Sequence, residues 1–268
     1  MPFKLACSTL HWKNPDLEAA LNELAKAGWD GWEARLPLDW LGTPARLRRV
    51  CRDAGMPLVV YTASGSPDLR DRVVVESNRR RMEFAAEIGA DCYMFMNAGK
   101  PQGRAVTHDD LKAAAEGAEE WAEYAAPLGL ELSYHIHTNL LVDSADDWKT
   151  YMSYLHKAKL CIDVSHADLW GYDPVQSLRD FRDQLNYVHL QDYSDCSRRD
   201  DGYYLPTWVD VGQAQSVDFP AVREALLDIG YNRWVTAVPG GVIPEHENEV
   251  SEARRSKRIV DYLRGIGY

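Results

Sequence analysis

The segment Leu160-Cys-Ile-Asp-Val-Ser-His166 begins as a short apolar run, typical of a buried strand, and ends in polar side chains. The segment Tyr187-Val-His-Leu-Gln-Asp192 repeats this pattern further along, and Tyr134-His-Ile-His137 ends the strand before them. In a barrel of alternating strands and helices, the carboxyl ends of the strands meet on one face, where polar residues carry chemistry. The three segments therefore predict both the fold and the place of its site.

The rest of the chain alternates apolar runs with helical periodicity in the same way. Strands are predicted over 4–10, 31–35, 58–62, 92–97, 130–137, 160–164, 187–191 and 234–238, and helices over 16–27, 44–54, 72–88, 109–126, 145–156, 175–184, 220–229 and 247–265. Eight strand–helix units favour an α/β fold of the (β/α)8 TIM barrel type over an open sheet. We expect residues 1–268 to form a single TIM-barrel domain, in which 192–217 is a long loop.

Composition excludes several classes of function. The net charge of −11 opposes binding to nucleic acid, and the absence of a long apolar run disfavours secretion and membrane insertion. The five cysteines form no CxxC motif, which is typical of a reducing cytoplasm, and Cys7, Cys92 and Cys161 are expected to be buried thiols. A cytoplasmic protein with a small-molecule partner is the expectation, and a homo-oligomer remains open.

Four side chains at the strand ends could hold or serve a divalent metal. His135 and His137 share one face of a strand because alternate side chains point the same way. With Asp163 and His189 they offer imidazole and carboxylate ligands, which divalent metals bind. The alternative for each is a hydrogen-bonded polar group of the core.

Other candidates flank these residues. Glu33 lies in a short apolar strand and is costly to bury unless it is paired. Arg35 is on the same side of that strand, so the two form either a buried ion pair or part of a substrate site. Trp12 and Trp170 follow strands and could stack on a sugar ring or cap the barrel. Between 197 and 201, two arginines precede two aspartates that would neutralise them.

In order along the chain, several motifs resemble those of the sugar isomerase/epimerase superfamily of xylose isomerase-like barrels. They are Gly28-Trp-Asp-Gly-Trp-Glu33, Asp163-Val-Ser-His166, His189-Leu-Gln-Asp192, Val211-Gly212, Val217-Asp-Phe219 and Gly230-Tyr-Asn-Arg-Trp234. Within the superfamily, His11-Trp-Lys-Asn14 and Tyr134-His-Ile-His137 are similar to the inosose dehydratase group. The resemblance implies elimination of water from a keto-polyol with a divalent metal such as Mn²⁺ or Co²⁺; Mg²⁺ and Zn²⁺ are alternatives.

The chain departs from the epimerases of that superfamily at two ligand positions. In those enzymes strands 5 and 8 each end in a metal-binding glutamate, whereas His135 and Val238 stand at the matching positions here. A metal held by His135, Asp163 and His189 would keep a net charge of +1 and act as a stronger Lewis acid. Glu245, His246 or Glu247 could fold back to supply the missing ligand.

These observations predict a metal-dependent dehydratase, a carbon–oxygen lyase acting on a keto-sugar or keto-cyclitol such as an inosose. His137 or His166 would act as the base, because an imidazole titrates near neutral pH. Glu33 is a further catalytic candidate. Hydroxyl groups of the substrate would be held by Glu33, Arg35, Trp12 and Asp192, and Trp170 would also contact the substrate. The alternatives are a sugar isomerase or epimerase using imidazoles, and a metal-free barrel that has lost catalysis and binds a partner.

Overall fold

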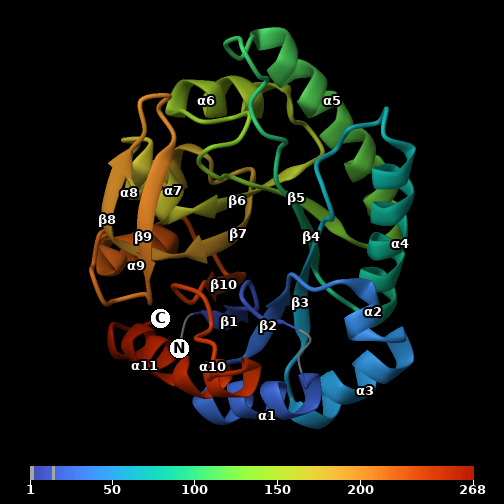
Figure 1. Cartoon of the computed structure of the whole chain (residues 1–268), viewed down its shortest axis with the longest axis vertical. Helices are drawn as coiled ribbons and strands as arrows, with labels where there is room; N and C mark the ends of the chain where they lie inside the picture. The colour runs from blue at the N-terminus through green and yellow to red at the C-terminus, as the bar shows by residue number, and fades with distance from the viewer. Residues whose placement is uncertain (1–2, 14–15) are drawn as a thin grey trace.

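Eight parallel strands close into a barrel in the computed structural model, which describes residues 3–13 and 16–268 (Figure 1). Each strand pairs with two neighbours in the order β1-β10-β7-β6-β5-β4-β3-β2. The strands are β1 (Lys4–Ser8), β2 (Gly31–Ala34), β3 (Leu58–Thr62), β4 (Cys92–Phe95), β5 (Glu131–His135), β6 (Lys159–Asp163), β7 (Leu185–Leu190) and β10 (Trp234–Ala237). The predicted (β/α)8 TIM barrel is confirmed.

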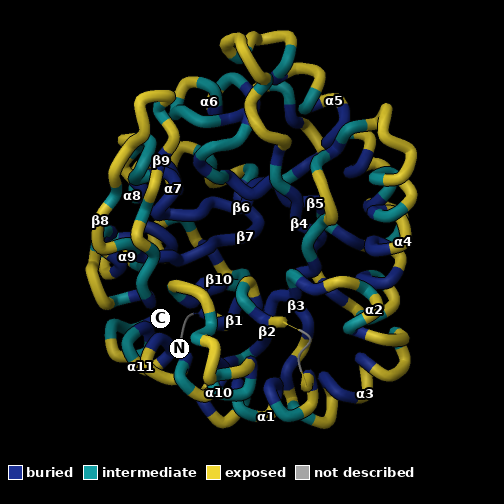
Figure 2. Tube along the Cα trace, in the orientation of Figure 1, coloured by how far each residue is buried: buried dark blue, intermediate teal, exposed yellow. Residues whose placement is uncertain are grey.

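Helices surround the barrel, and the strands inside them are buried (Figure 2). The Asp16 carboxylate caps the first helix by accepting from the backbone N–H of Ala19, and Gly28 ends it at φ 105°, a conformation open to glycine without strain. The helices are α1 (Leu17–Ala27), α2 (Leu38–Leu41), α3 (Pro44–Ala54), α4 (Arg72–Ile88), α5 (His108–Ala125), η1 (Ala126–Leu128), α6 (Ala145–Tyr154), α7 (Val164–Leu169), α8 (Pro174–Asp180), α9 (Phe219–Asp228), α10 (Glu249–Arg255) and α11 (Lys257–Gly265). None of the helices in the described part of the chain has both the length and the apolar character that crossing a bilayer requires.

Strand register brings the predicted site residues to one level of the barrel. Asp163 pairs with His189 across β6 and β7, and His189 pairs with Thr236 across β7 and β10. His135 pairs with Cys161 across β5 and β6, two residues before Asp163 on β6. The three predicted cysteines Cys7, Cys92 and Cys161 are buried thiols, as expected.

The structure departs from the predicted elements mainly after β7. The expected loop over 192–217 contains an antiparallel hairpin of β8 (Asp192–Arg198) and β9 (Tyr204–Val209). Most side chains of β8 are not buried, so the alternation of apolar and polar residues that marks a strand is absent. The last predicted helix is two helices, α10 and α11, that meet at Ser256.

Candidate active site

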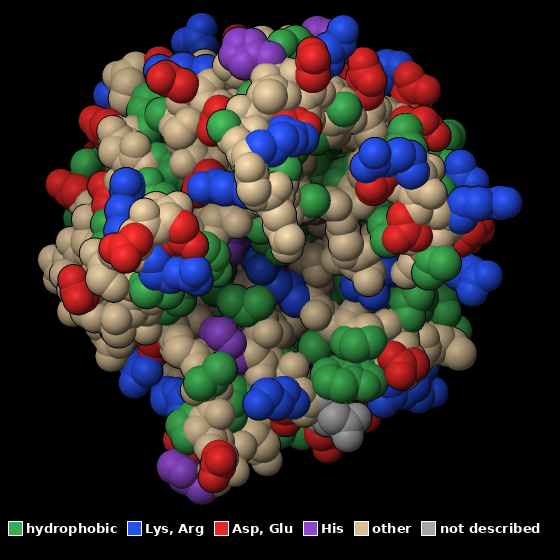
Figure 3. All heavy atoms as spheres, turned by 45° about the horizontal axis from the view of Figure 1, so that its top comes forward, with side chains coloured by type: hydrophobic (Ala, Val, Ile, Leu, Met, Phe, Trp, Pro, Cys, Tyr) green, Lys and Arg blue, Asp and Glu red, His purple; other side chains and the backbone are tan. Residues whose placement is uncertain are grey.

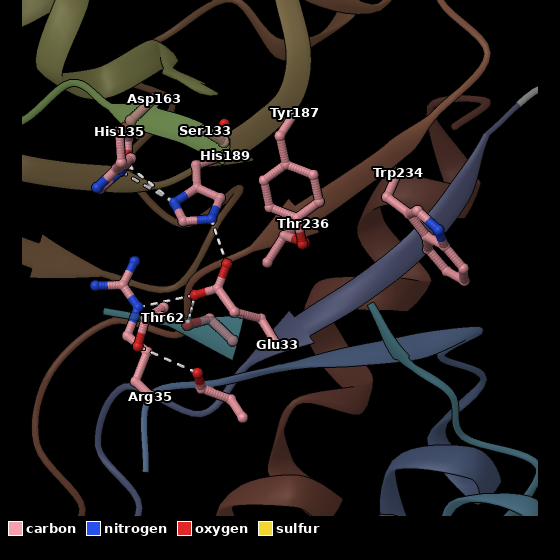
Figure 4. Close-up of polar contacts among 12 residues, drawn as sticks. Glu33, Arg35, Thr62, Ser133, His135, Asp163, Tyr187, His189, Trp234 and Thr236 are labelled. Carbon is pink, nitrogen blue, oxygen red and sulfur yellow. Dashed lines mark hydrogen bonds and ion pairs between the residues drawn. The ribbon is translucent and has the colours of Figure 1, made fainter. Parts of the chain in front are cut away.

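Three donor atoms from consecutive strands face one another at the carboxyl end of the barrel (Figure 4). Nδ1 of His189 lies 3.1 Å from Nε2 of His135 and 3.9 Å from Oδ2 of Asp163. The third separation, from His135 Nε2 to Asp163 Oδ2, is 3.5 Å. Ligands with bonds of about 2.0–2.2 Å to one ion stand roughly 3–3.6 Å apart. Two of the three separations match this range, and the 3.9 Å separation exceeds it by about 0.3 Å.

Glu33 fixes the orientation of His189. Its Oε2 atom lies 2.6 Å from Nε2 of His189, and its Oε1 atom accepts from Arg35 Nε and Ser8 Oγ, both at 2.8 Å. Burial alone would raise the pKa of Glu33, but His189 and Arg35 outweigh it and lower the pKa to about 2. A charged Glu33 holds the proton of His189 on Nε2 and leaves Nδ1 with a lone pair directed at His135 and Asp163.

Asp163 has one oxygen engaged and one free. Oδ1 caps helix α7 by accepting from the backbone N–H groups of Ser165 and His166. Oδ2 is buried without a hydrogen-bond partner among the described residues. Burial raises the pKa of Asp163 to about 6, although His189 acts in the opposite direction. A buried carboxylate oxygen without a donor is costly, and a cation at this point would remove that cost.

His135 completes the set. Its side chain is buried, and burial lowers its pKa well below the usual range, so the ring is neutral and able to act as a ligand. Cys161 also offers a sulfur within 4.8 Å of ligand atoms of His135 and His189. Burial raises the pKa of Cys161 well above its ordinary value, so it stays a thiol while Asp163 carries the better ligand atom. The donor set therefore fits a divalent cation.

The imidazoles of His137 and His166 lie beside this set, and Thr138 determines which nitrogen of each ring carries the proton. Nδ1 of His137 lies 2.7 Å from the carbonyl oxygen of Thr138, so it donates its proton there and Nε2 keeps the lone pair. The backbone N–H of Thr138 donates to Nδ1 of His166 at 3.3 Å, so His166 carries its proton on Nε2. The ring centroids are 4.1 Å apart, and burial lowers the pKa of His137 to about 4 and that of His166 well below its usual range.

The remaining predicted residues have clear structural partners. Arg35 points its guanidinium toward the donor set while its Nε pairs with Glu33 (Figure 4). Trp12 is buried and stacks on Trp32 at a centroid distance of 6.4 Å. Trp170 donates its indole N–H to Asp143 at 3.1 Å. Stacking of either indole on a substrate stays a prediction.

The structure gives Asp192 a different role from the predicted binding of substrate hydroxyl groups. Its carboxylate is buried and accepts six hydrogen bonds from Tyr193 and from residues 212–216. Each oxygen accepts three of these, which leaves no lone pair for a substrate hydroxyl. Asp192 instead holds the loop that precedes α9.

The region beyond β10 supplies no replacement ligand. Val238 is buried two residues after Thr236 and follows it on the same side by strand alternation. Glu245 is exposed, the His246 side chain is 83% exposed, and Glu247 forms an ion pair with Arg255. The suggestion that one of these three folds back to the site is therefore wrong within the described residues.

Three contributors to the site escaped the sequence analysis. Ser8 donates to Glu33, Thr138 sets the protons of both imidazoles, and Trp208 of β9 places its ring 5.3 Å from that of His166. No pattern marks them. Ser8 and Trp208 contact segments distant in the chain, and Thr138 acts through its backbone groups on the adjacent His137 and on His166. Figure 3 shows a central hollow with basic and histidine side chains along its walls.

A sequence model described as the xylose isomerase-like TIM barrel matches residues 21–259. The chain belongs to this family. It is 23% identical to inosose dehydratase of Geobacillus kaustophilus (strain HTA426), with 98% of this chain and 95% of that protein aligned. Two solved structures share the fold. The 3-keto-D-glucoside 4-epimerase YcjR of E. coli matches with a TM-score of 0.75 at 19% identity, and an IOLI protein with a bound zinc atom does so with a TM-score of 0.75 at 18% identity; each comparison covers 98% of this chain and 99% of the other.

Proposed function

We propose that this chain is a divalent-metal-dependent dehydratase that removes water from a keto-sugar or keto-cyclitol such as an inosose. The observation that carries the proposal is the pair of His137 and His166 beside the three-atom donor set. The sequence similarity to an inosose dehydratase over nearly the whole chain supports the same substrate class.

His135, Asp163 and His189 would hold the metal. When bound, a divalent cation supplies Lewis-acid polarisation of the substrate ketone, which acidifies the neighbouring C–H bond. Two imidazole ligands favour Zn²⁺, Co²⁺ or Mn²⁺ over Mg²⁺, which prefers oxygen ligands. The zinc atom in the IOLI protein, which shares this fold, agrees with that preference.

His137 would move the proton. Its Nε2 lone pair is fixed by the hydrogen bond from Nδ1 to Thr138. Burial lowers the pKa of His137 to about 4, so the ring is neutral at physiological pH and is a weaker base than the near-neutral imidazole expected from the sequence. The C–H electron pair forms the new double bond as the proton passes to Nε2. The C–O bond at the next carbon breaks, and the same proton then leaves with the hydroxide as water, so His137 ends unchanged.

His166 would assist without giving up its proton. Its Nε2–H is buried and, among the described residues, has no acceptor. Loss of that proton would create an imidazolate, because Nδ1 already accepts from Thr138. A neutral imidazole can still donate a hydrogen bond to the departing oxygen.

This arrangement favours elimination over epimerisation. Inversion at a carbon needs a proton removed from one face and returned to the other. The two imidazoles stand side by side at a centroid distance of 4.1 Å, and Val238, at the strand-8 position of the epimerase glutamate, carries no proton. A single proton carrier on one face of the substrate is sufficient for the removal of water.

The test combines metal analysis with product analysis. The purified protein is assayed for bound metal and then incubated with inososes and keto-sugars, and products are weighed by mass spectrometry. Loss of one water is the expected result. A product of unchanged mass would instead identify an isomerase or epimerase. A protein with neither bound metal nor turnover would be the metal-free barrel that has lost catalysis.

A further inference from the structure

A cavity of about 430 Å³ lies at the carboxyl ends of β1 to β4. Its size lies in the range of small-molecule sites, about 300–1,000 Å³. Arg35 belongs both to its wall and to the hydrogen-bonded chain that runs through Glu33 to His189. A ligand that contacts Arg35 in the cavity is therefore linked through Arg35 and Glu33 to the proposed metal ligand His189.

The wall of this cavity is mainly apolar. Leu10, Met94, Met96 and Leu140 line it, and among the described lining residues Arg35 alone is charged. Leu10 is 38% exposed, so its side chain is accessible to a ligand in the cavity. Thr62, Ser66, Asn97 and Arg35 offer hydrogen bonds on part of the wall. Hydroxyl groups of a polyol placed against the apolar part would lose hydrogen bonds to water without replacement.

We infer that the natural substrate carries an apolar alkyl or aryl substituent on its keto-sugar or keto-cyclitol ring, and that this substituent occupies the cavity. The inference rests on the proposed function, since it places the ketone at the donor set and the ring beside Arg35. The substituent then extends over Leu10, Met96 and Leu140. Flexible methionine side chains suit an apolar group of variable shape.

The test compares a free keto-sugar, its methyl glycoside and its hexyl glycoside as substrates. The hexyl compound should have a kcat/KM at least about tenfold above the methyl compound, because burying two methylenes is worth roughly that factor. Leu10→Asn should reduce this ratio several-fold. Leu227→Asn is the matched control, since Leu227 is also 38% exposed but lies on α9.

A binding measurement separates this inference from the proposed reaction. The dissociation constants of hexyl and methyl glucosides, which lack the ketone, are measured by calorimetry on the parent and both variants. Turnover without any preference for the hexyl group would overturn the cavity inference alone. Preferential hexyl binding that depends on Leu10, without turnover of any ketone, would support the cavity and refute the dehydratase. Equal binding of both glucosides, with no turnover, would refute both.

Discussion

Nε2 of His189 lies 2.6 Å from Oε2 of Glu33, and Nδ1 of the same ring lies 3.1 Å from Nε2 of His135. Glu33 and His189 are 156 residues apart in the chain, and both side chains are fully buried. One carboxylate thus decides which nitrogen of His189 is free. Carboxylates that orient a ligand histidine raise metal affinity without touching the metal.

Replacing Glu33 with glutamine should therefore weaken metal binding by about 10–100-fold. The amide keeps the shape but loses the charge that holds the proton of His189 on Nε2 and that neutralises Arg35. The dissociation constant of Zn²⁺ or Co²⁺, from competition with a chelating dye, measures the effect. Glu18→Gln, on the exposed face of α1, is the control and should bind as the parent does. Parent affinity in Glu33→Gln would show that Glu33 only pairs with Arg35.

Two substitutions at Asp163 separate its roles. Asparagine caps a helix about as well as aspartate, so Asp163→Asn should keep α7 while losing most bound metal. Asp163→Ala should lose the metal and also about 1 kcal/mol of the free energy of unfolding, because the cap is removed. Metal content reports whether Asp163 is a ligand, and urea unfolding of chelator-treated protein reports the loss of the helix cap. If Asp163→Asn retained the parent's metal, Asp163 would not be a ligand.

Substitution of a metal ligand and substitution of a proton carrier should have different effects on metal content and turnover. His189→Ala should lose both metal and turnover. His137→Ala should keep its metal while turnover falls by about 10²–10⁴-fold, the usual contribution of a general base, and added imidazole should restore part of it. His166→Ala should also keep its metal and lose less activity. Equal metal content in all three variants would contradict the division between ligands and proton carriers.

Restoring the carboxylate of the epimerases at Val238 should tighten metal binding, since it adds a negative ligand to a net-positive site. It should also slow elimination, because the added charge weakens the Lewis acid. Val238 is 1% exposed, so the metal-free variant should unfold at a lower temperature and regain stability when metal is added. Val238→Gln, of similar shape without the charge, is the control. Unchanged or weaker affinity in Val238→Glu would place the site elsewhere.

Glu252, a buried residue of α10 beside Trp12, predicts a pH effect on stability. Burial raises its pKa to about 7, with Arg255 acting against this and Asp210 and Glu249 adding to it. The folded state thus holds the proton more tightly than the unfolded chain, whose pKa is near 4.5. The stabilising contribution is complete below pH 4.5 and disappears as the pH rises through about 7.

Glu252→Gln imitates the protonated carboxyl and should remove this dependence. Urea unfolding of parent and variant from pH 4 to pH 8 measures it as a difference, which cancels the other groups that titrate. The free energy of unfolding of the variant, relative to that of the parent, should increase as the pH rises, by no more than roughly 3 kcal/mol. A difference that stays constant with pH would show that Glu252 is ionised throughout.

Much of the fold follows from local pattern. Apolar runs, helical periodicity and glycine stops predicted all eight barrel strands, and β3, α3 and α4 have the predicted bounds. The hairpin of β8 and β9 was missed because most of its side chains lie outside the core, so no alternation of apolar and polar residues marks its strands. Helix α7 was missed because it is six residues long and relies on Asp163 for its cap.

The sequence by itself determined which residues stand at the ends of β5, β6 and β7, since strand period and order put His135, Asp163 and His189 at one face of the barrel. Tertiary structure decided what those residues can do. Glu33 selects the free nitrogen of His189, Thr138 gives His137 a lone pair and His166 a proton, and the backbone of residues 212–216 occupies Asp192. The physical reason is that periodicity reports how far a side chain is buried. Its protonation, and whether a lone pair is left for a ligand, depends on neighbours that closure of the barrel brings from distant parts of the chain.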